Sequence, residues 1–365
     1  MRLLGSGLTK PPSSPLGLVP TADIATPVRR YPGMAVARLS TRMTRLLGVE
    51  HPVALGGMAG HGGPQLVAAV SEAGGLGVLG ATLLAPDSVA EVAADIRNRT
   101  GRPFGLNLLL FQSPPDLVSA VLEAAPAVLS TAWAPPEYDL RSLFGAAHER
   151  GLLAMHMIST LPEARAAEAA GADLIVAQGT EGGGHVGTMG TTVLVRQVAR
   201  EAQVPVLGAG GFADGSGLAA ALALGAEGIL LGTRFLATVE SPLPDSFKQV
   251  IVDSDGHSTL LTEIPDLASN RVWPGAYARV TRNRLVEDWL GRENELRRHQ
   301  VEVLARIQAA RRAGDPGYAV LYAGQTAGLI DSVRPAREVV ESLVAEAASV
   351  IGELAARLRA EDSPA

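Results

Sequence analysis

The sequence contains no cysteine, which excludes disulfides, thiolate metal ligands and a cysteine nucleophile. Aromatic residues make up only 4% of the chain, so alanine, glycine, leucine and valine must fill its core. No uninterrupted apolar run approaches the roughly 20 residues that a membrane span requires. The formal net charge of −6 provides no basic surface for nucleic acid. We therefore expect a protein that binds neither membranes nor nucleic acid. Our expectation for its state is a cytoplasmic monomer or homodimer.

The first part of the chain differs in composition from the rest. Residues 1–33 are rich in proline, serine, threonine and glycine and lack the apolar block of a signal peptide. We expect residues 1–43 to form a flexible extension, with Met34 and Met43 as alternative starts of the protein. No function is assigned to this extension.

From His51 onward, short apolar runs alternate with helical segments at roughly even spacing. The runs cover residues 52–55, 76–80, 104–109, 127–131, 152–157, 173–177, 204–208 and 228–233. Strands that alternate with helices indicate a parallel sheet, and eight such units predict an α/β fold of the closed (β/α)8 TIM-barrel type. The alternative is an open doubly wound sheet, which needs a topological switch point and usually has fewer strands.

A long segment after the eighth predicted strand interrupts the repeat. We expect residues 44–235 and 317–362 to form the barrel, and residues 236–316 to form a small, largely helical inserted domain. Its place on the catalytic rim suits a lid or a pocket wall. For Trp273, Tyr277 and Trp289 we prefer a packing role to a pocket role. The many charges of residues 283–313 indicate a solvated outer face.

A glycine-rich segment, Gln178–Gly187, follows the sixth predicted strand. Consecutive glycines let the backbone approach a flat or phosphorylated ligand and offer it N–H groups. His185 stands where a base that titrates near neutral pH would be useful. By itself the segment also fits a glycine turn with a solvent-facing histidine.

Further glycines follow strands seven and eight, where barrels commonly bind a phosphate. Gly210, Gly211 and Gly232 would bind the dianion through backbone N–H groups without a lysine. The simpler interpretation is that these glycines only end their strands. The glycine loop of strand six, beside them, favours the phosphate site.

Two amides, Asn107 and Gln178, lie at predicted strand ends. A buried amide must find partners, so each is a satisfied core group or a ligand for a heteroaromatic ring such as a flavin. We expect no metal site, because the histidines and carboxylates show no ligand spacing.

The remaining histidines receive weaker assignments. His51 and His148 are expected at the surface, and His61 follows the first glycine loop, within reach of a flavin. His156 ends strand five and is the best second candidate for a site residue, with its ring expected in the barrel mouth. His257 and His299 have no partner that the sequence identifies.

The chain resembles the nitronate monooxygenase family (formerly 2-nitropropane dioxygenases), which includes flavin-dependent enoyl-acyl carrier protein reductases. The resemblance runs from about Thr44 to about Leu358, and its motifs fall in order at predicted strand ends. These motifs are residues 57–60, 72–77, 104–107, Gln178 with 181–185, 208–211, 231–235 and 323–325. The family usually has Gln-Ala-Pro-Met where this chain has Leu55-Gly56-Gly57-Met58, which would widen the pocket floor. It usually has alanine where Gly182 stands here.

The resemblance implies an FMN-containing barrel in which His185 is the catalytic base. It implies that Met58 and Asn107 line the flavin ring, and that Gln178 and Gly183 bind it by side chain and backbone. The FMN phosphate would lie against Gly210, Gly211, Gly232 and Thr233. Gly57, Gly184, Leu231 and Gln325 complete the expected cofactor site.

The implied reaction is FMN-dependent oxidation of alkyl nitronates or nitroalkanes by O2 to a carbonyl compound and nitrite. The alternative on the same scaffold is a reductase that passes hydride from NAD(P)H to an enoyl thioester or a quinone. A third hypothesis is a barrel that binds a phosphorylated ligand without redox chemistry. In each case the expected partner is a small molecule, with O2 as co-substrate of the oxygenase.

Overall fold

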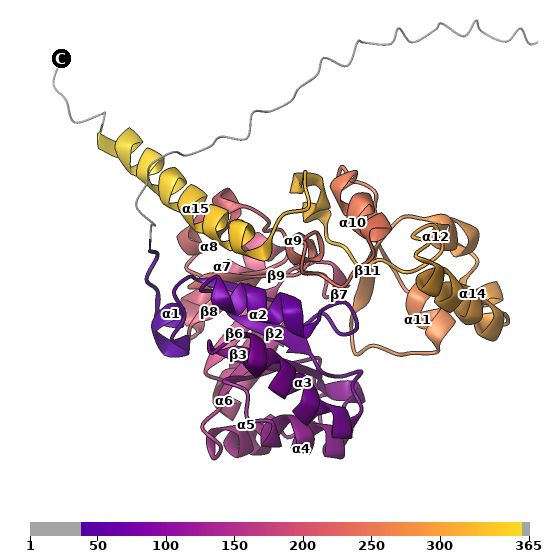
Figure 1. Ribbon diagram of the computed structural model, residues 1–365, viewed down its shortest axis with the longest axis horizontal. Helices are drawn as coiled ribbons and strands as arrows, with labels where there is room; N and C mark the ends of the chain where they lie inside the picture. The colour runs from indigo at the N-terminus through magenta and orange to yellow at the C-terminus, as the bar shows by residue number, and fades with distance from the viewer. Residues whose placement is uncertain (1–37, 360–365) are drawn as a thin grey trace, which may run out of the picture. The chain divides into compact units, whose positions relative to one another are not determined.

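Eight parallel strands form a closed barrel in the computed structural model, which describes residues 38–359 (Figure 1). The ladder order is β1-β9-β8-β6-β5-β4-β3-β2, and a parallel bridge between Ala54 and Leu76 closes the ring. The barrel strands are β1 (Val53–Leu55), β2 (Gly77–Gly80), β3 (Phe104–Leu109), β4 (Val128–Ala132), β5 (Leu153–Ile158), β6 (Leu174–Gln178), β8 (Val206–Ala209) and β9 (Gly228–Leu231). The (β/α)8 prediction is confirmed.

Helices on the outside connect consecutive barrel strands. Proline stands in the first turn of α2, α3, α4 and α6, where its missing N–H costs no hydrogen bond. Gly171 ends α6 at φ 104°, a left-handed conformation that favours glycine. The outer helices are α2 (Pro64–Glu72), α3 (Pro86–Arg99), α4 (Pro115–Glu123), α5 (Leu140–His148), α6 (Leu161–Ala170), α7 (Thr191–Glu201), α8 (Gly215–Ala223) and α15 (Ala336–Arg359), with a short 3-10 turn, η1 (Leu110–Gln112), after β3.

Side chains alternate between two hydrophobic layers along each barrel strand. On β5, Leu153, Met155 and Met157 face the barrel interior. Ala154 and Ile158 of the same strand belong to the larger cluster between the strands and the helices. This period of two decides which side chains can reach a site at the mouth of the barrel.

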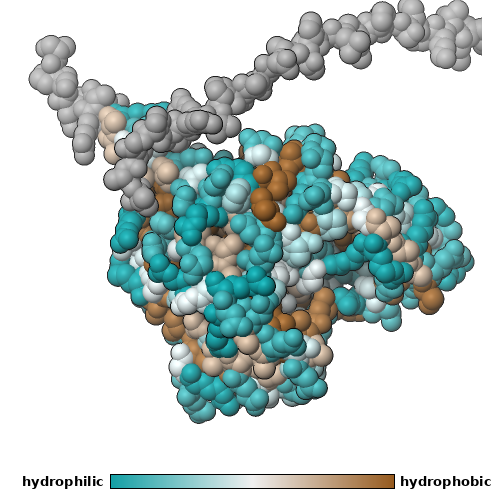
Figure 2. Space-filling view, viewed as in Figure 1, coloured by the Kyte–Doolittle hydropathy of each residue, from teal (hydrophilic) through white to brown (hydrophobic). Residues whose placement is uncertain are grey.

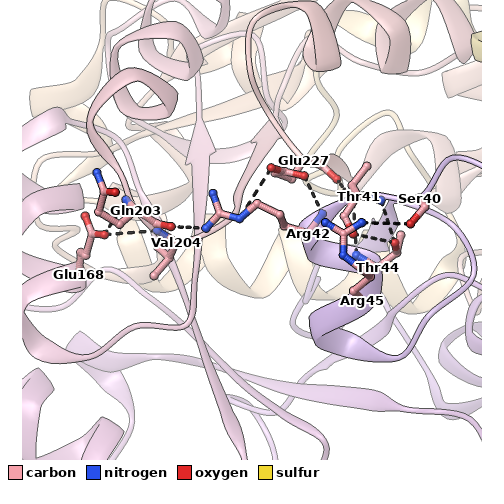
Figure 3. A network of polar contacts seen from close by, with 9 residues as sticks. All are labelled: Ser40, Thr41, Arg42, Thr44, Arg45, Glu168, Gln203, Val204 and Glu227. Atoms are coloured by element: carbon pink, nitrogen blue, oxygen red, sulfur yellow. Dashed lines mark hydrogen bonds and ion pairs between the residues drawn. The ribbon is translucent and has the colours of Figure 1, made fainter.

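A short helix, α1 (Arg42–Leu47), is attached to the barrel by polar contacts (Figure 3). The Thr41 side chain caps the helix and also donates to the Glu227 carbonyl at 2.7 Å. The Arg42 backbone N–H donates to the Glu227 carboxylate at 2.8 Å, and the Arg42 guanidinium donates to the Gln203 carbonyl. Residues 38–43, which were assigned to the flexible extension, are therefore ordered here, and residues 1–37 lie outside the described residues.

The apolar face of α1 extends the interior core. Met43 is fully buried, and with Leu47 it joins the cluster inside the barrel. Buried side chains of this kind exclude water from the end of the barrel opposite the site.

The segment between β9 and α15 contains two strands as well as helices. Its elements are α9 (Thr233–Leu236), α10 (Asp245–Val252), β10 (Thr259–Thr262), α11 (Ile264–Ser269), β11 (Tyr277–Thr281), α12 (Arg284–Trp289), α13 (Glu293–Leu296), α14 (Gln300–Ala313) and a 3-10 turn, η2 (Gln325–Leu329). The expectation of a largely helical insertion overlooked β10 and β11. These strands form an antiparallel sheet with β7 (Gly184–Val186), a strand within the glycine-rich segment.

Arg234 connects the start and the end of the insertion. Its Nη2 donates to the carbonyls of Ala237 at 2.8 Å and Ser332 at 2.7 Å, on the outgoing and returning chain. A parallel bridge between Thr238 and Arg334 lies beside these bonds. Burial lowers the pKa of the Arg234 guanidinium to about 10, which leaves it charged at neutral pH.

The charged helices of the insertion expose their polar side, as expected. Glu302, Arg306 and Arg312 of α14 are exposed, while Val303 and Ile307 pack in the insertion's own core. Figure 2 shows hydrophilic residues over most of the part that α12 and α14 occupy in Figure 1.

The α1 packing generates a prediction. Met43→Ala should lower the free energy of unfolding by about 2–5 kcal/mol, because the cavity it leaves lies inside the barrel. Chemical denaturation of both proteins measures the difference. Arg45→Ala on the exposed side of the same helix is the matched control and should change stability by no more than about 0.5 kcal/mol. Equal effects of the two substitutions would contradict a structural role for the buried face.

Candidate functional site

A cavity of about 290 Å³ opens at the carboxyl ends of the barrel strands, between the strands and the insertion. This is the edge at which barrels place their functional residues. Its lining includes all the predicted site residues except Gln325, namely Gly57, Met58, Asn107, Gln178, Gly183, Gly184, His185, Gly210, Gly211, Leu231, Gly232 and Thr233. The structure thus brings together residues that span most of the barrel sequence.

His185 is held by the insertion as much as by the barrel. It lies on β7 opposite Ala278 of β11, and its Nε2 is 2.9 Å from Oδ1 of Asp266 on α11. The two side chains are only 7% and 9% exposed. An ionised carboxylate can only accept, so Nε2 carries the proton and Nδ1 of the neutral ring is the acceptor.

Trp273 lies against the ring of His185. The ring centroids are 3.4 Å apart and the planes differ by 9°, so the indole covers one face of the imidazole. Phe111 and Trp133 in turn contact Trp273. Trp273 therefore packs against other rings, as we expected, but it also lines the cavity.

Two other polar rings line the same cavity. Tyr322 is 5.6 Å from the His185 ring and 5.8 Å from the His61 ring, measured between centroids. Burial raises the pKa of the Tyr322 hydroxyl, and the Asp266 charge acts in the same direction, so Tyr322 is a neutral donor. Burial, with a smaller effect from Arg311, lowers the pKa of His61 to about 4. His61 is therefore uncharged at neutral pH.

The two predicted amides point into the cavity. Asn107 donates from Nδ2 to the Ser130 hydroxyl at 2.9 Å, which fixes its orientation. A Cβ at Gly57 would lie 2.3 Å from the Asn107 Cβ, so Asn107 occupies the space that a larger residue at 57 would need. The departure at Gly57 therefore does not widen the pocket floor at this point.

Some polar atoms of the lining lack partners. Gln178 Oε1 and Trp273 Nε1 are buried without a hydrogen-bond partner among residues 38–359. Burying an acceptor and a donor without hydrogen-bond partners costs free energy. A ligand that donates to Gln178 and accepts from Trp273 would therefore stabilise this arrangement.

A cradle of backbone atoms forms where three loops meet. Gly210 has φ 81°, and a Cβ there would lie 2.8 Å from the Gly182 nitrogen, so only glycine fits. A Cβ at Gly183 would lie 2.5 Å from the Gly324 nitrogen. Thr233 Oγ1 accepts from that nitrogen at 2.9 Å. The three loops therefore pack backbone against backbone here, and a side chain at Gly183 or Gly210 would push them apart.

The glycine-rich loop is held on both sides. The Glu181 carboxylate accepts from the Thr191 backbone at 2.9 Å and from its hydroxyl at 2.6 Å, at the start of α7. Arg279 of β11 donates from Nε to the Thr180 carbonyl at 2.9 Å. The loop therefore has a defined shape despite its glycines.

Other predicted residues lie differently from the expectation. Gln325 is exposed and outside the cavity lining, and its backbone N–H donates to the Glu181 carbonyl. The Leu231 side chain packs between strands and helices, so it can offer the cavity only its backbone. Tyr277 is exposed, and Trp289 donates to the Tyr318 hydroxyl within the insertion.

Two histidine assignments were wrong. His51 is 4% exposed rather than at the surface. His156 faces the helix layer rather than the barrel mouth, because Met155 and Met157 take the inward positions of β5. Its Nδ1 lies 2.7 Å from the Thr131 hydroxyl and its ring packs against Phe144 of α5. Burial lowers the pKa of His156 to about 4.

Sequence reasoning missed four residues of the site region: Asp266, Arg271, Arg311 and Tyr322. Asp266 contacts a histidine 81 residues earlier in the chain, and no local sequence pattern predicts that contact. Among residues 38–359 no group of histidines and acids could hold a metal ion, and no helix is long and apolar enough to cross a membrane.

Several known proteins are similar to this chain in sequence. The sequence profile of the family described as nitronate monooxygenase matches residues 40–117 and 115–346. A Mycobacterium tuberculosis protein named (3aS,4S,5R,7aS)-5-hydroxy-7a-methyl-1-oxo-octahydro-1H-indene-4-carboxyl-CoA dehydrogenase is 33% identical, over 85% of this chain and 96% of its own. A nitronate monooxygenase of Paraburkholderia phytofirmans is 31% identical, over 85% and 95%.

Solved structures are also similar. FabK from Thermotoga maritima superposes with a TM-score of 0.79 and 36% identity, covering 87% of this chain and 99% of that one. The nitroalkane oxidase of Streptomyces ansochromogenes gives a TM-score of 0.75 and 32% identity, covering 86% and 100%.

The buried His156 predicts a pH dependence of stability. Because its folded pKa is about 4, below the ordinary 6.5, the unfolded chain binds a proton first as the pH falls. Stability should therefore decrease between pH 6.5 and 4, with a contribution from His156 of roughly 3 kcal/mol. Denaturation midpoints across this range should show a shallower slope for His156→Asn. Thr131→Val keeps the buried imidazole and should retain the slope, and an unchanged slope in both variants would contradict the prediction.

Proposed function

Because the chain belongs to the nitronate monooxygenase family, we propose that it is an FMN-dependent enzyme that oxidises alkyl nitronates with O2 to a carbonyl compound and nitrite. The observation that carries this proposal is the buried contact between His185, which lines the cavity, and Asp266 behind it. Neutral nitroalkanes would also be substrates, since this pair provides a base for them.

The residues of the cavity fit FMN. Gly210, Gly211 and Gly232 line the cavity at the ends of β8 and β9 and would offer backbone N–H groups to one phosphate. Gln178 presents an unpartnered Oε1, and Asn107 uses its Nδ2, not its Oδ1, in the bond to Ser130. Both amides would therefore have an acceptor available for the flavin ring. When bound, FMN would supply the two-electron chemistry that links a nitronate to oxygen.

His185 would act on the proton. Its Nδ1 is the acceptor of the neutral ring, and a nitroalkane must lose a proton from its α-carbon to become a nitronate. Asp266 would hold the ring in the required tautomer and stabilise the imidazolium that forms, while Trp273 fixes the plane of the ring. Tyr322, a neutral donor beside the same ring, would orient the nitro group.

The second candidate is an NAD(P)H-dependent reductase that acts on a thioester at the same flavin. Similarity to FabK at 36% identity, and to a CoA dehydrogenase at 33%, supports this alternative. Two arginines, Arg271 and Arg311, line the cavity and suit a substrate more highly charged than a nitronate.

Bound FMN is the first expectation. The purified protein should show a flavin absorption spectrum and release FMN rather than FAD on denaturation, because one phosphate cradle leaves no site for an adenosine half. Chromatography of the released cofactor distinguishes the two. A colourless protein that takes up no added FMN would reject the cofactor assignment.

The second expectation separates the proton acceptor from the binding site. His185→Asn should lower oxidation of neutral nitroalkanes by about 10²–10⁴-fold, since the base is lost. A nitronate supplied already deprotonated should be affected far less. Asp266→Asn should lower nitroalkane turnover in the same direction by a smaller factor, with FMN content retained.

Steady-state rates on both substrate forms measure these effects. Glu263→Gln is the matched control, because Glu263 is an exposed acid next to α11 that does not line the cavity. Equal losses on both forms would show that His185 orients the substrate and is not the base. No turnover of either form by the wild type, with rapid NAD(P)H consumption, would favour the reductase.

A further inference from the structure

The charge of the cavity lining is opposite to that of the chain. The protein carries a formal net charge of −6, yet none of the described residues that line the cavity is an aspartate or a glutamate. The lining contains two guanidinium groups, those of Arg271 and Arg311. A positive wall of this kind attracts and orients anions.

The two arginines lie on different parts of the insertion. Arg271 follows α11, and its backbone N–H donates to the Asp266 carbonyl at 2.9 Å. Arg311, in the last turn of α14, donates from Nη2 to the Gly60 carbonyl at 2.6 Å, which ties it to the loop after β1. Both residues are exposed, so they stand at the solvent side of the cavity.

Neither guanidinium faces a carboxylate within the described part of the chain. Elsewhere in the insertion, Arg284, Arg292 and Arg306 each lie within 4 Å of an acid, at 3.1, 2.8 and 3.7 Å. No side-chain bond of Arg271 to another residue of 38–359 is found, and Arg311 uses a single Nη2. Donors of both therefore remain available to a ligand.

Tyr322 lies within the field of both arginines. Each guanidinium favours the ionised form of the Tyr322 hydroxyl, although burial and Asp266 outweigh them and its pKa stays raised. Arg311 likewise disfavours a proton on His61. The charges of Arg271 and Arg311 are therefore felt in one region of the cavity, beside Tyr322. The glycine loops lie elsewhere, at the ends of β6, β8 and β9.

We propose that Arg271 and Arg311 bind the phosphate groups of a tail carried by a second substrate, outside the flavin site. A guanidinium matches a phosphate with two parallel hydrogen bonds, and two of them at the solvent side would hold a tail whose reactive end reaches the flavin. Such a tail is found in CoA thioesters and in phosphorylated nicotinamide dinucleotides, which share this chemistry. The inference rests on the proposed flavin site and gives the second candidate function its substrate class.

The test is equilibrium binding to the FMN-loaded enzyme. Free CoA and NADP⁺ are titrated separately by calorimetry, with pantetheine, which has no phosphate, as the uncharged probe. At least one phosphorylated ligand should bind the wild type, more weakly as ionic strength rises. Arg271→Gln and Arg311→Gln should each weaken that binding by about 10-fold or more, and lysine at either position should restore part of it.

Arg312→Gln is the matched control. It removes the same charge from α14, but Arg312 is exposed and does not line the cavity, so binding should be unchanged. The response of CoA or of NADP⁺ identifies the source of the tail. If neither binds the wild type at millimolar concentration, or if Arg312→Gln weakens binding as much as the cavity variants, the proposal is wrong.

Nitronate turnover by the wild type is measured in parallel. Its absence with tail binding intact would reject the oxygenase and keep the arginine site, whereas turnover without binding of either ligand would reject the arginine site alone.

Discussion

The ladder between β7 and β11 is the constraint on which the site depends. It sets Ala278 opposite His185, and so fixes a residue of the barrel sequence to a strand of the insertion. Asp266 and Trp273 then reach the same imidazole from that insertion, by a 2.9 Å contact and by stacking. Without this pairing, no backbone ladder would hold the histidine of the glycine-rich segment at the barrel mouth.

The barrel and the glycine positions follow from local physical rules. Parallel strands buried on both faces are short apolar runs, and runs such as residues 104–109 and 174–178 can be recognised without long-range information. Gly210 could be placed in the site because parallel strands carry their ligands at their carboxyl ends, and the structure gives the reason in its φ of 81°. Position along a strand was therefore enough to place every predicted site residue except Gln325 at the cavity.

Orientation and long-range contact could not be obtained in the same way. His156 was assigned to the mouth of the barrel, but a phase error of one residue on a strand moves a side chain to the opposite face. Asp266 contacts a histidine 81 residues earlier, and the short strand β11 pairs with β7, which lies still further away along the chain. Neither β11 nor the carboxylate therefore leaves a local signal. Gln325 followed a motif, yet only its backbone contributes, through a bond to Glu181.

The shared strand also limits how such proteins can be recombined. In sequence, residues 236–316 look like a unit that could be exchanged between relatives. Arg234 hydrogen-bonds to Ala237 at the start of this segment and to Ser332 on the chain that returns to the barrel. The pairing of β7 with β11 means that a transplanted unit arrives without its third strand, and the recipient keeps a histidine whose carboxylate and covering indole have been replaced. A functional chimera must therefore exchange residues 184–186 together with the insertion. The residues that must be exchanged together come from two separate stretches of the sequence.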